Sequence, residues 1–472
     1  MKIATPVLSI ALAAGSLWAS PRYPFPRNLS YPHGIKTTLS SATGGEIQTA
    51  FESWKEKQLD SSGTLMRVKF DDPSVTVSEG IGYGMLIMVY MDNATNNTQG
   101  QFDKLWNYYV KFKNNNGLMN WKISGYNSVS GANGATDADL DVAFALLIAY
   151  KQWGNESYLT NAKTLIQTIY GKEVDASTSL LKPGDGWQSW NDAYNPSYFS
   201  PAAIELFKTV DPSHGWANVL AKNYALVKLN AAKSTAGLPS NWCNYQTGIA
   251  TNGNTQVGFD YDAVRTPWRL GIGYSWFGHD TAKTIDAAIT KWVMTKTGSV
   301  ARLIMDGYDQ SGNARSNSYG NVATFVGAFG AAAMVDVTYQ AWLNNIYTDL
   351  KLAANGAGYY HSSLKVLYEL YLSGNFNNFW DTTSTTSIDD HVSALRVDQF
   401  SVRQTGVQLA ISGLEASEMR AQLVDLSGRV QRTATGSHEL SMDVSGLSQG
   451  AYVLRLVTPQ GSLSSTVVLT GR

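Results

Sequence analysis

The sequence predicts a mainly α-helical protein, a helical barrel or toroid followed by a small antiparallel β-sandwich. Between about residues 30 and 380, apolar residues recur at three- and four-residue spacings, as they do on one face of a helix. From residue 394 onward, apolar and polar residues alternate, which is the period of a half-buried strand. A chain of 472 residues is also too long for one ordinary core, so two folded units are expected.

Eleven stretches carry the helical spacing, and loops rich in Gly, Asn, Ser and Trp separate them. The stretches are 46–58, 81–92, 102–112, 137–153, 158–169, 201–208, 216–232, 281–294, 322–338, 341–352 and 362–372. Eleven or twelve helices with long loops favour a barrel or toroid, and long ordered loops usually carry function.

The first residues are typical of a secretory signal peptide. Lys2 precedes an apolar stretch that ends near Leu17, and a cut after Ala19 gives a signal peptide of residues 1–19. An uncleaved N-terminal membrane anchor is the alternative. No later apolar run reaches the roughly 18 residues that a membrane helix needs, so we expect no membrane span and a protein that is secreted or held at the cell surface.

The C-terminal region is expected to be a separate domain. The hydroxyl-rich run 382–387 predicts a linker over 381–393, and 407–411, 420–424 and 451–457 predict strands of a β-sandwich over 394–472. With no Trp and one Tyr, this region lacks the aromatic platform of a carbohydrate-binding module. Its segments 425–430 and 447–454 resemble the sorting or attachment domains of secreted bacterial enzymes, which implies contact with the cell surface or the secretion machinery.

Charge and aromatic content indicate which kind of molecule the protein binds. With 37 acidic and 36 basic residues, nucleic acid and anionic membranes are not expected partners, and a neutral carbohydrate fits better. The chain has 14 Trp and 25 Tyr; most should fill the core, while some could stack on sugar rings in a groove. The single cysteine, Cys243, excludes an internal disulfide and is expected to be a small buried residue.

The first candidate acid is Glu79, which stands directly before a glycine-rich helix start containing Gly80, Gly82 and Gly84. A carboxylate there could simply complement the helix dipole. The glycines, however, allow a bulky ligand to approach the backbone, and Tyr83 with apolar neighbours could raise the pKa of the acid. This pattern favours a general acid.

The second acidic group is Asp137, Asp139 and Asp141. Thr136 with Asp139 predicts a capping box, which leaves Asp137 unexplained. Three acids in five residues raise one another's pKa, as at many working sites. A calcium loop is the alternative, but the glycine and the later glutamate of such a loop are missing.

The third group is Asp262 and Arg265, which share a face of one helical turn. An arginine beside a carboxylate keeps it ionised, as a general base must be. A surface ion pair is the alternative interpretation. Phe259, Tyr261 and Trp268 favour a partly buried cleft instead.

Paired carboxylates are what glycoside hydrolysis requires, one as acid and one as base or nucleophile. The stretch 135–153, closed by 151–154, resembles the signature of glycoside hydrolase family 8. The segments 78–80, 194–201 and 262–265 match the same family in order and spacing, so the resemblance covers about residues 30 to 380.

The resemblance implies an (α/α)6 barrel with an open groove and an inverting mechanism. By position, Glu79 is the general acid, Asp262 is the base that activates water, and Asp137 grips the sugar at the cleavage point. An Asp at position 262 sets the chain apart from a branch of the family that lacks it and that holds many chitosanases.

The same resemblance implies four substrate contacts. Tyr198 would bind the attacking water, Arg265 would orient the base, Trp121 matches a sugar-stacking position, and Tyr194 lies in the matching 194–201 segment. This chemistry needs no metal and no cofactor.

The expected function is endo-acting hydrolysis of a β-1,4-glucan such as cellulose or mixed-linkage glucan. An endo-β-1,4-xylanase is the alternative within the family, since the two differ in whether loops tolerate a hydroxymethyl group, a difference of about 1–3 kcal/mol. A non-enzymatic polysaccharide-binding protein is the other alternative. It would be expected to lack the acid or the base, and both are present.

Overall fold

The computed structural model describes residues 20–187, 191, 193–251, 257–316, 318–353, 358–381, 401–405, 407–412, 419–425, 430–437, 439–458 and 461–469. The chain divides into two compact units, Met1–Trp380 and Asp381–Arg472. The expected signal peptide and residues 382–393 of the expected linker lie outside the described residues. Among the helices that are described, none combines the length and the apolar character needed to cross a membrane.

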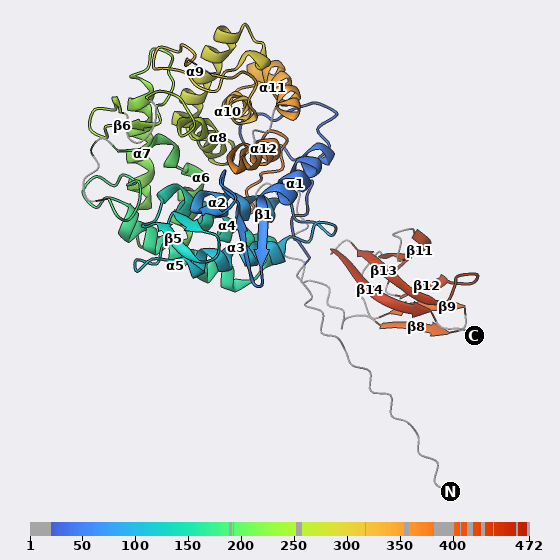
Figure 1. Cartoon of the computed structure of the whole chain (residues 1–472). Helices are drawn as coiled ribbons and strands as arrows, with labels where there is room; N and C mark the ends of the chain where they lie inside the picture. Colours follow the sequence, from blue (N-terminus) through green and yellow to red (C-terminus); the bar gives the residue numbers. More distant parts are fainter. Residues whose placement is uncertain are drawn as a thin grey trace. The chain divides into compact units, whose positions relative to one another are not determined.

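The first unit contains twelve α-helices in its described residues (Figure 1). They are α1 (Gly45–Gln58), α2 (Ser78–Tyr90), α3 (Gln99–Lys111), α4 (Thr136–Trp153), α5 (Glu156–Glu173), α6 (Pro201–Val210), α7 (Trp216–Ala231), α8 (Thr266–Phe277), α9 (Asp280–Thr297), α10 (Ala323–Ala333), α11 (Gln340–Leu352) and α12 (Tyr359–Leu372). Each of the eleven predicted stretches overlaps one of them. The stretch 322–338 is α-helical only as far as Ala333, and α8 was not predicted.

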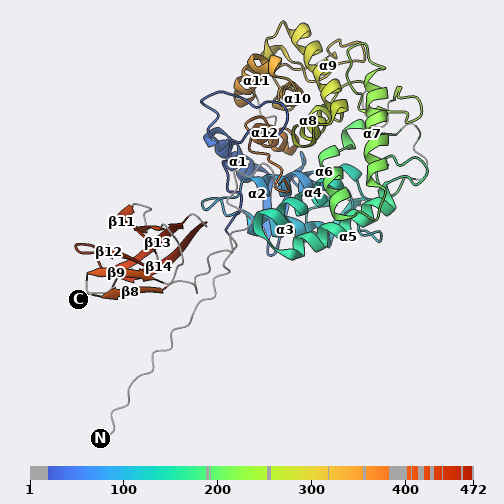
Figure 2. The same cartoon turned by 180° about the vertical axis from the view of Figure 1, so that it is seen from behind.

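The helices form two concentric rings. Each even-numbered helix packs against the next, from α2 through α4, α6, α8 and α10 to α12, and α12 closes the ring on α2. Each odd-numbered helix packs outside one of them: α1 on α12, α3 on α2, α5 on α4, α7 on α6, α9 on α8 and α11 on α10. Figure 1 and, from behind, Figure 2 show this arrangement. The predicted (α/α)6 barrel is confirmed.

The side chains explain which helices lie inside. Every residue of α10 is buried, and in α2 every residue except Glu79 is buried, because these helices are surrounded by others. The outer helix α11 instead buries a single stripe, which includes Trp342, Ile346 and Leu350. The glycines of α2 permit close packing: a Cβ on Gly82 would lie 3.0 Å from the Asp141 Cβ in α4.

Short strands occupy the loops of the barrel and were not predicted. They are β1 (Leu59–Ser62), β2 (Leu65–Val68), β3 (Val75–Val77), β4 (Lys122–Ser124), β5 (Ser128–Gly131), β6 (Trp242–Cys243) and β7 (Ala250–Thr251). In the antiparallel sheet β3-β4-β5, Val77 pairs with Lys122, which brings the chain before Lys122 beside the start of α2. Cys243 in β6 is buried, as expected.

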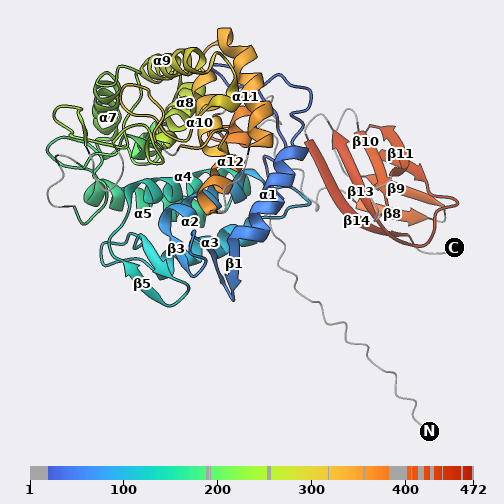
Figure 3. The same cartoon turned by 45° about the horizontal axis from the view of Figure 1, so that its top comes forward.

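The second unit consists of antiparallel strands (Figure 3). They form two sheets, ordered β11-β10-β13-β14 and β12-β9-β8. The strands are β8 (Ser401–Thr405), β9 (Gln408–Ser412), β10 (Met419–Val424), β11 (Val430–Gly436), β12 (Glu439–Asp443), β13 (Gly450–Thr458) and β14 (Gly461–Leu469). Leu409 and Ile411 of one sheet share a core with Leu423, Leu454 and Leu456 of the other. The predicted β-sandwich is therefore confirmed.

The capping box predicted at the start of α4 is wrong. The Thr136 hydroxyl makes no cap and donates instead to the Lys182 carbonyl at 2.6 Å. Asp139 is buried and accepts a hydrogen bond from the Tyr109 hydroxyl. A neighbouring segment thus offers these side chains better partners than the helix end does.

Candidate active site

Three acids far apart in the sequence meet at one arginine. Nη1 of Arg265 donates to Oε1 of Glu79 and, at 2.7 Å, to Oδ2 of Asp137. Nη2 of Arg265 donates to Oδ1 of Asp262 at 3.0 Å. Because the Arg265 side chain is only 3% exposed, these carboxylates compensate a buried positive charge.

The cluster lies where the inner helices begin. Glu79 and Asp137 occupy the first turns of α2 and α4, and Arg265 is the residue from which α8 starts. Tyr359, the first residue of α12, donates to Oε2 of Glu79. A helix N-terminus carries a partial positive charge, so several of them at one place favour a group of carboxylates.

The surroundings of Glu79 are more polar than its sequence neighbours suggest. Its carboxylate accepts hydrogen bonds from Tyr83 at 3.0 Å, from Tyr359 and from Arg265. Tyr83 is an expected neighbour, while Tyr359 and Arg265 come from other helix starts. The expected apolar environment of this acid is therefore wrong.

Asp137 is the most deeply buried of the three acids. Burial raises the pKa of its carboxyl to about 7, and the nearby charges of Glu79 and Asp141 act in the same direction. Arg265 and Arg269 oppose this shift in the pKa of Asp137. Desolvation is thus the main cause, and the crowding of carboxylates identified in the sequence is a smaller one.

Both oxygens of Asp262 are held. Arg265 binds Oδ1, and the indole Nε1 of Trp242, in β6, donates to Oδ2 at 3.0 Å. The Asp262 side chain remains 21% exposed, so a water molecule can reach it. Trp242 was not identified from the sequence.

Tyr198 lies next to this carboxylate group. It ends a short 3-10 helix, η1 (Pro196–Tyr198), and its ring packs against the Trp242 ring at a centroid distance of 5.8 Å. The guanidinium carbon of Arg265 lies 5.4 Å from the centre of the Tyr198 ring. The negative charges of Asp137 and Asp262 add to burial in raising the pKa of the Tyr198 hydroxyl, which therefore keeps its proton.

Two predicted substrate contacts occupy different settings. Trp121 is 42% exposed, and its carbonyl accepts a hydrogen bond from the Ser78 amide at 2.9 Å, which places its backbone beside Glu79. Tyr194 is 1% exposed, and its hydroxyl donates to Asn223 at 2.9 Å. Contact between that hydroxyl and a sugar would require this hydrogen bond to break.

Two further aromatic residues at the site were missed. Tyr359 binds Glu79, and the Tyr360 hydroxyl donates to the carbonyl of Tyr261, next to Asp262. The helix predicted over 362–372 left both outside. The available signal was a pair of tyrosines after Gly358, at a helix start equivalent to that of Glu79.

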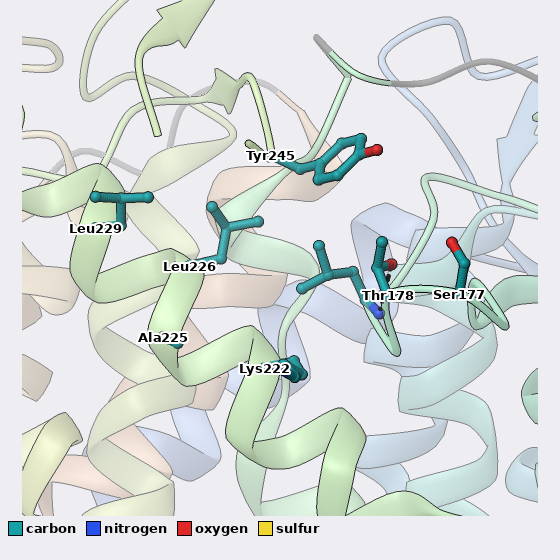
Figure 4. Close-up of a pocket in the computed structure, with 8 residues that line it drawn as sticks. Ser177, Thr178, Lys222, Ala225, Leu226, Leu229 and Tyr245 are labelled. Carbon is teal, nitrogen blue, oxygen red and sulfur yellow. Dashed lines mark hydrogen bonds between the residues drawn. The ribbon is translucent and has the colours of Figure 1, made fainter. Parts of the chain in front are cut away.

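A pocket of about 330 Å³ lies elsewhere, between the turn containing Ser177 and the helix α7 (Figure 4). Leu226 and Leu229 of α7 line it together with Tyr245, and none of the three carboxylates does. Among the described residues, no group of three or more acidic, His or Cys side chains is arranged to hold a metal ion. The carboxylate cluster around Arg265 is the candidate active site.

Three carboxylates gathered by one arginine, beside an exposed tryptophan at one end of an (α/α)6 barrel, are the arrangement expected of a glycoside hydrolase. The chain belongs to glycosyl hydrolases family 8, whose family model matches residues 23–374. It is 38% identical to Endoglucanase 2 of Ruminiclostridium josui over 383 residues, covering 78% of this chain and 80% of that protein.

Two other relatives differ in what their names report. The structure of a β-1,3-1,4-glucanase from Paenibacillus sp. X4 is 30% identical, with a TM-score of 0.70, over 75% of this chain and 99% of that one. A reducing end xylose-releasing exo-oligoxylanase from Halalkalibacterium halodurans is 24% identical over 63% of this chain and 79% of that protein.

Proposed function

We propose that the protein is a secreted endo-acting hydrolase of β-1,4-linked glucan that inverts the configuration at the cleaved bond. The observation that supports this most strongly is the single Arg265 guanidinium that gathers Glu79, Asp137 and Asp262 from three elements. The relatives at 30% identity or more that we compared are named as glucanases, whereas the one named for xylan is 24% identical. Cellulose and mixed-linkage glucan are therefore favoured over xylan.

The spacing of the acids is compatible with the division of roles that the family resemblance implies. Glu79 and Asp262 bind different terminal nitrogens of one guanidinium, so their accepting oxygens lie at most about 8 Å apart. Inverting enzymes place their carboxyl groups about 6.5–9.5 Å apart, with room for one water molecule, and retaining enzymes place them about 5–5.5 Å apart. The bound fits both spacings, so inversion rests on the resemblance to the family. Glu79 then protonates the leaving oxygen, and Asp262 takes a proton from the water.

Proton donation requires one rearrangement. Glu79 must carry a proton to act as an acid, and Arg265 now donates to the same carboxylate. In the productive complex the glycosidic oxygen takes the place of that contact, while Arg265 stays on Asp137 and Asp262. Asp137 holds the sugar at the cleavage point, Tyr198 binds the attacking water, and Trp121 stacks on a neighbouring sugar ring.

The ends of the chain support a location outside the cytoplasm. Residues 1–19 have the order of charge and apolar character of a signal peptide, with Lys2 before the apolar stretch. The C-terminal β-sandwich would contact the secretion machinery or the cell surface.

Hydrolysis by the full-length protein tests this function. Reducing ends should be released from carboxymethylcellulose and lichenan faster than from xylan. Glu79→Gln should lose about 10²–10⁴-fold in kcat on these polymers, because only proton donation is removed. The same variant should lose far less on an aryl cellobioside whose phenol leaves without protonation.

The matched control is Glu56→Gln, at an exposed position of α1, which should keep wild-type activity. If the wild type releases reducing ends from none of the three polymers, the proposed function is wrong. If Glu79→Gln keeps full activity on the polymers, Glu79 is not the general acid.

A further inference from the structure

A second ion pair lies directly beneath the three carboxylates, and the proposed reaction does not use it. Nη1 of Arg269 donates to Oδ1 of Asp141 at 2.6 Å, and Nη2 donates to Oδ2 at 2.8 Å. The two side chains are 1% and 2% exposed. This bidentate geometry fixes the plane of the guanidinium as well as its distance from the carboxylate.

The Arg269–Asp141 pair repeats the Arg265–Asp137 contact one helical turn further into the barrel. Asp141 follows Asp137 by four residues on α4, and Arg269 follows Arg265 by four residues into α8. Residues four apart lie above one another on a helix, so Arg265–Asp137 and Arg269–Asp141 form two rungs between the same two segments.

These rungs cross the inside of the ring. In the ring, α6 stands between α4 and α8 and packs against both (Figure 1). The two ion pairs therefore join helices that are not neighbours. A buried ion pair is costly to separate, so the lower rung limits how α8 can slide or turn against α4.

We propose that Asp141 and Arg269 are positioning residues for catalysis: their ion pair sets the register of α8 against α4 and thereby aims Arg265 at Glu79, Asp137 and Asp262. The inference rests on the proposed function and deepens it. Asp141 also meets α2, because its Cβ would lie 3.0 Å from a Cβ on Gly82, three residues after Glu79. The pair thus lies on the helix that carries Asp137 and on the helix that follows Asp262, and it packs against the helix that carries Glu79.

The charges of the pair act on the site in opposite directions. The Arg269 charge lowers the pKa of Asp137 and the Asp141 charge raises it, while burial remains the largest cause of the shift. The titratable and charged groups that interact with the pair include Asp137 and Arg265 on its own segments. From α2 and α12 they include Glu79, Tyr83 and Tyr368. A variant that loses one charge should therefore change the pH dependence of the reaction in a direction set by the sign of that charge.

The test compares Asp141→Asn, Arg269→Gln and the double variant in the full-length protein, measured below the unfolding temperature of each. Each single variant should lower kcat by about 10- to 100-fold, because a small displacement of Arg265 misplaces all three acids. KM should change less than kcat. The limbs of the pH profile of kcat/KM should move to lower pH in Asp141→Asn and to higher pH in Arg269→Gln, and the double variant should return toward the wild-type profile.

The ion pair of Arg67 and Asp60, which joins β1 to β2 outside the ring, offers a matched control. Arg67→Gln should lower the unfolding temperature without moving the pH profile. If the single variants do not fold, Asp141→Leu with Arg269→Met replaces the pair with apolar groups, and this folded protein should still show the loss in kcat.

Wild-type kcat and pH profiles in the folded variants, or in the apolar double variant, would overturn the inference and leave the pair a purely structural contact. An inactive wild type would instead remove the proposed function. If activity depends on Glu79 but is unchanged in every variant of Asp141 and Arg269, only the positioning role of the pair is wrong.

Discussion

The carboxylate of Asp262 is fixed through both of its oxygens, by Arg265 on one side and by the Trp242 indole on the other. A base that abstracts a proton from water must present one lone pair in a defined direction, so these two donors set its aim. The sequence identified Asp262 and Arg265 because they are three residues apart. It gave no indication of Trp242, which comes from a hairpin 20 residues earlier and forms no periodic pattern with the base.

Trp242→Phe should keep the aromatic packing against Tyr198 and remove only the hydrogen bond to Asp262. A hydrogen bond to a charged group contributes about 1.5–3 kcal/mol, so kcat should fall about 10-fold or more. Because the carboxylate loses a donor, the acidic limb of the pH profile should move to higher pH. Steady-state kinetics across pH measures both effects.

Trp106→Phe, on the outer helix α3, is the control and should leave kinetics unchanged. An unaltered pH profile in Trp242→Phe would mean that the indole does not hold the base.

At the scale of elements, the helix that carries Arg269 is the one that the sequence did not reveal. Ten of the twelve residues of α8 are buried, so it has no polar face and no amphipathic stripe. Gly271 and Gly273, which lower helix propensity, let it pack closely: a Cβ on Gly271 would lie 3.0 Å from the Tyr371 hydroxyl. Outer helices such as α11 show a clear stripe, which is why periodicity found them.

Gly82→Ala should test the close contact between α2 and α4. The new Cβ would lie 3.0 Å from the Asp141 Cβ and 3.3 Å from the Ala138 carbonyl, which belongs to the helix backbone and cannot rotate away. We expect a loss of about 1–3 kcal/mol in the free energy of unfolding and a lower kcat, because α2 carries Glu79. Denaturant unfolding and kinetics on the same sample measure the two effects.

Gly171→Ala in α5 is the matched control, since nothing lies within 4 Å of the Cβ position. It should gain about 0.5–1 kcal/mol from helix propensity alone. A comparable gain in Gly82→Ala would show that α2 and α4 have room to separate.

At the scale of the molecule, the ring gives the site its chemistry. Acids from the starts of α2 and α4, with Asp262 just before α8, meet only because the inner helices form a closed ring. Helical periodicity and the resemblance to the family together predicted a barrel and its acids. The donors around them depend on long-range contacts, and no local pattern encodes which loop comes to face Glu79 or Asp262.

Buried acids also make the stability of the fold depend on pH. Burial raises the pKa of Asp139 from 3.8 to about 7 and that of Glu369 from 4.5 to about 8. The native state therefore keeps protons that the unfolded chain releases, so the contribution of these groups is complete below about pH 4 and is lost as pH rises toward 8. The unfolding temperature, measured by calorimetry, should fall between pH 5 and pH 8.

Asp139→Asn should make that slope smaller, whereas Asp280→Asn, at an exposed position of α9, should leave it unchanged. A slope that is equally steep in Asp139→Asn would mean that this acid is ionised in the native state.

The configuration of the first product tests the central claim most directly, since it reports whether water attacks from the side opposite the leaving group. Proton NMR spectra recorded during hydrolysis of a β-1,4-linked cello-oligosaccharide by the wild type separate the two anomers before they interconvert. With Glu79 as acid and Asp262 as base acting through one water molecule, the new reducing end appears first as the α anomer. A β anomer that appears first would contradict the assigned roles of both acids.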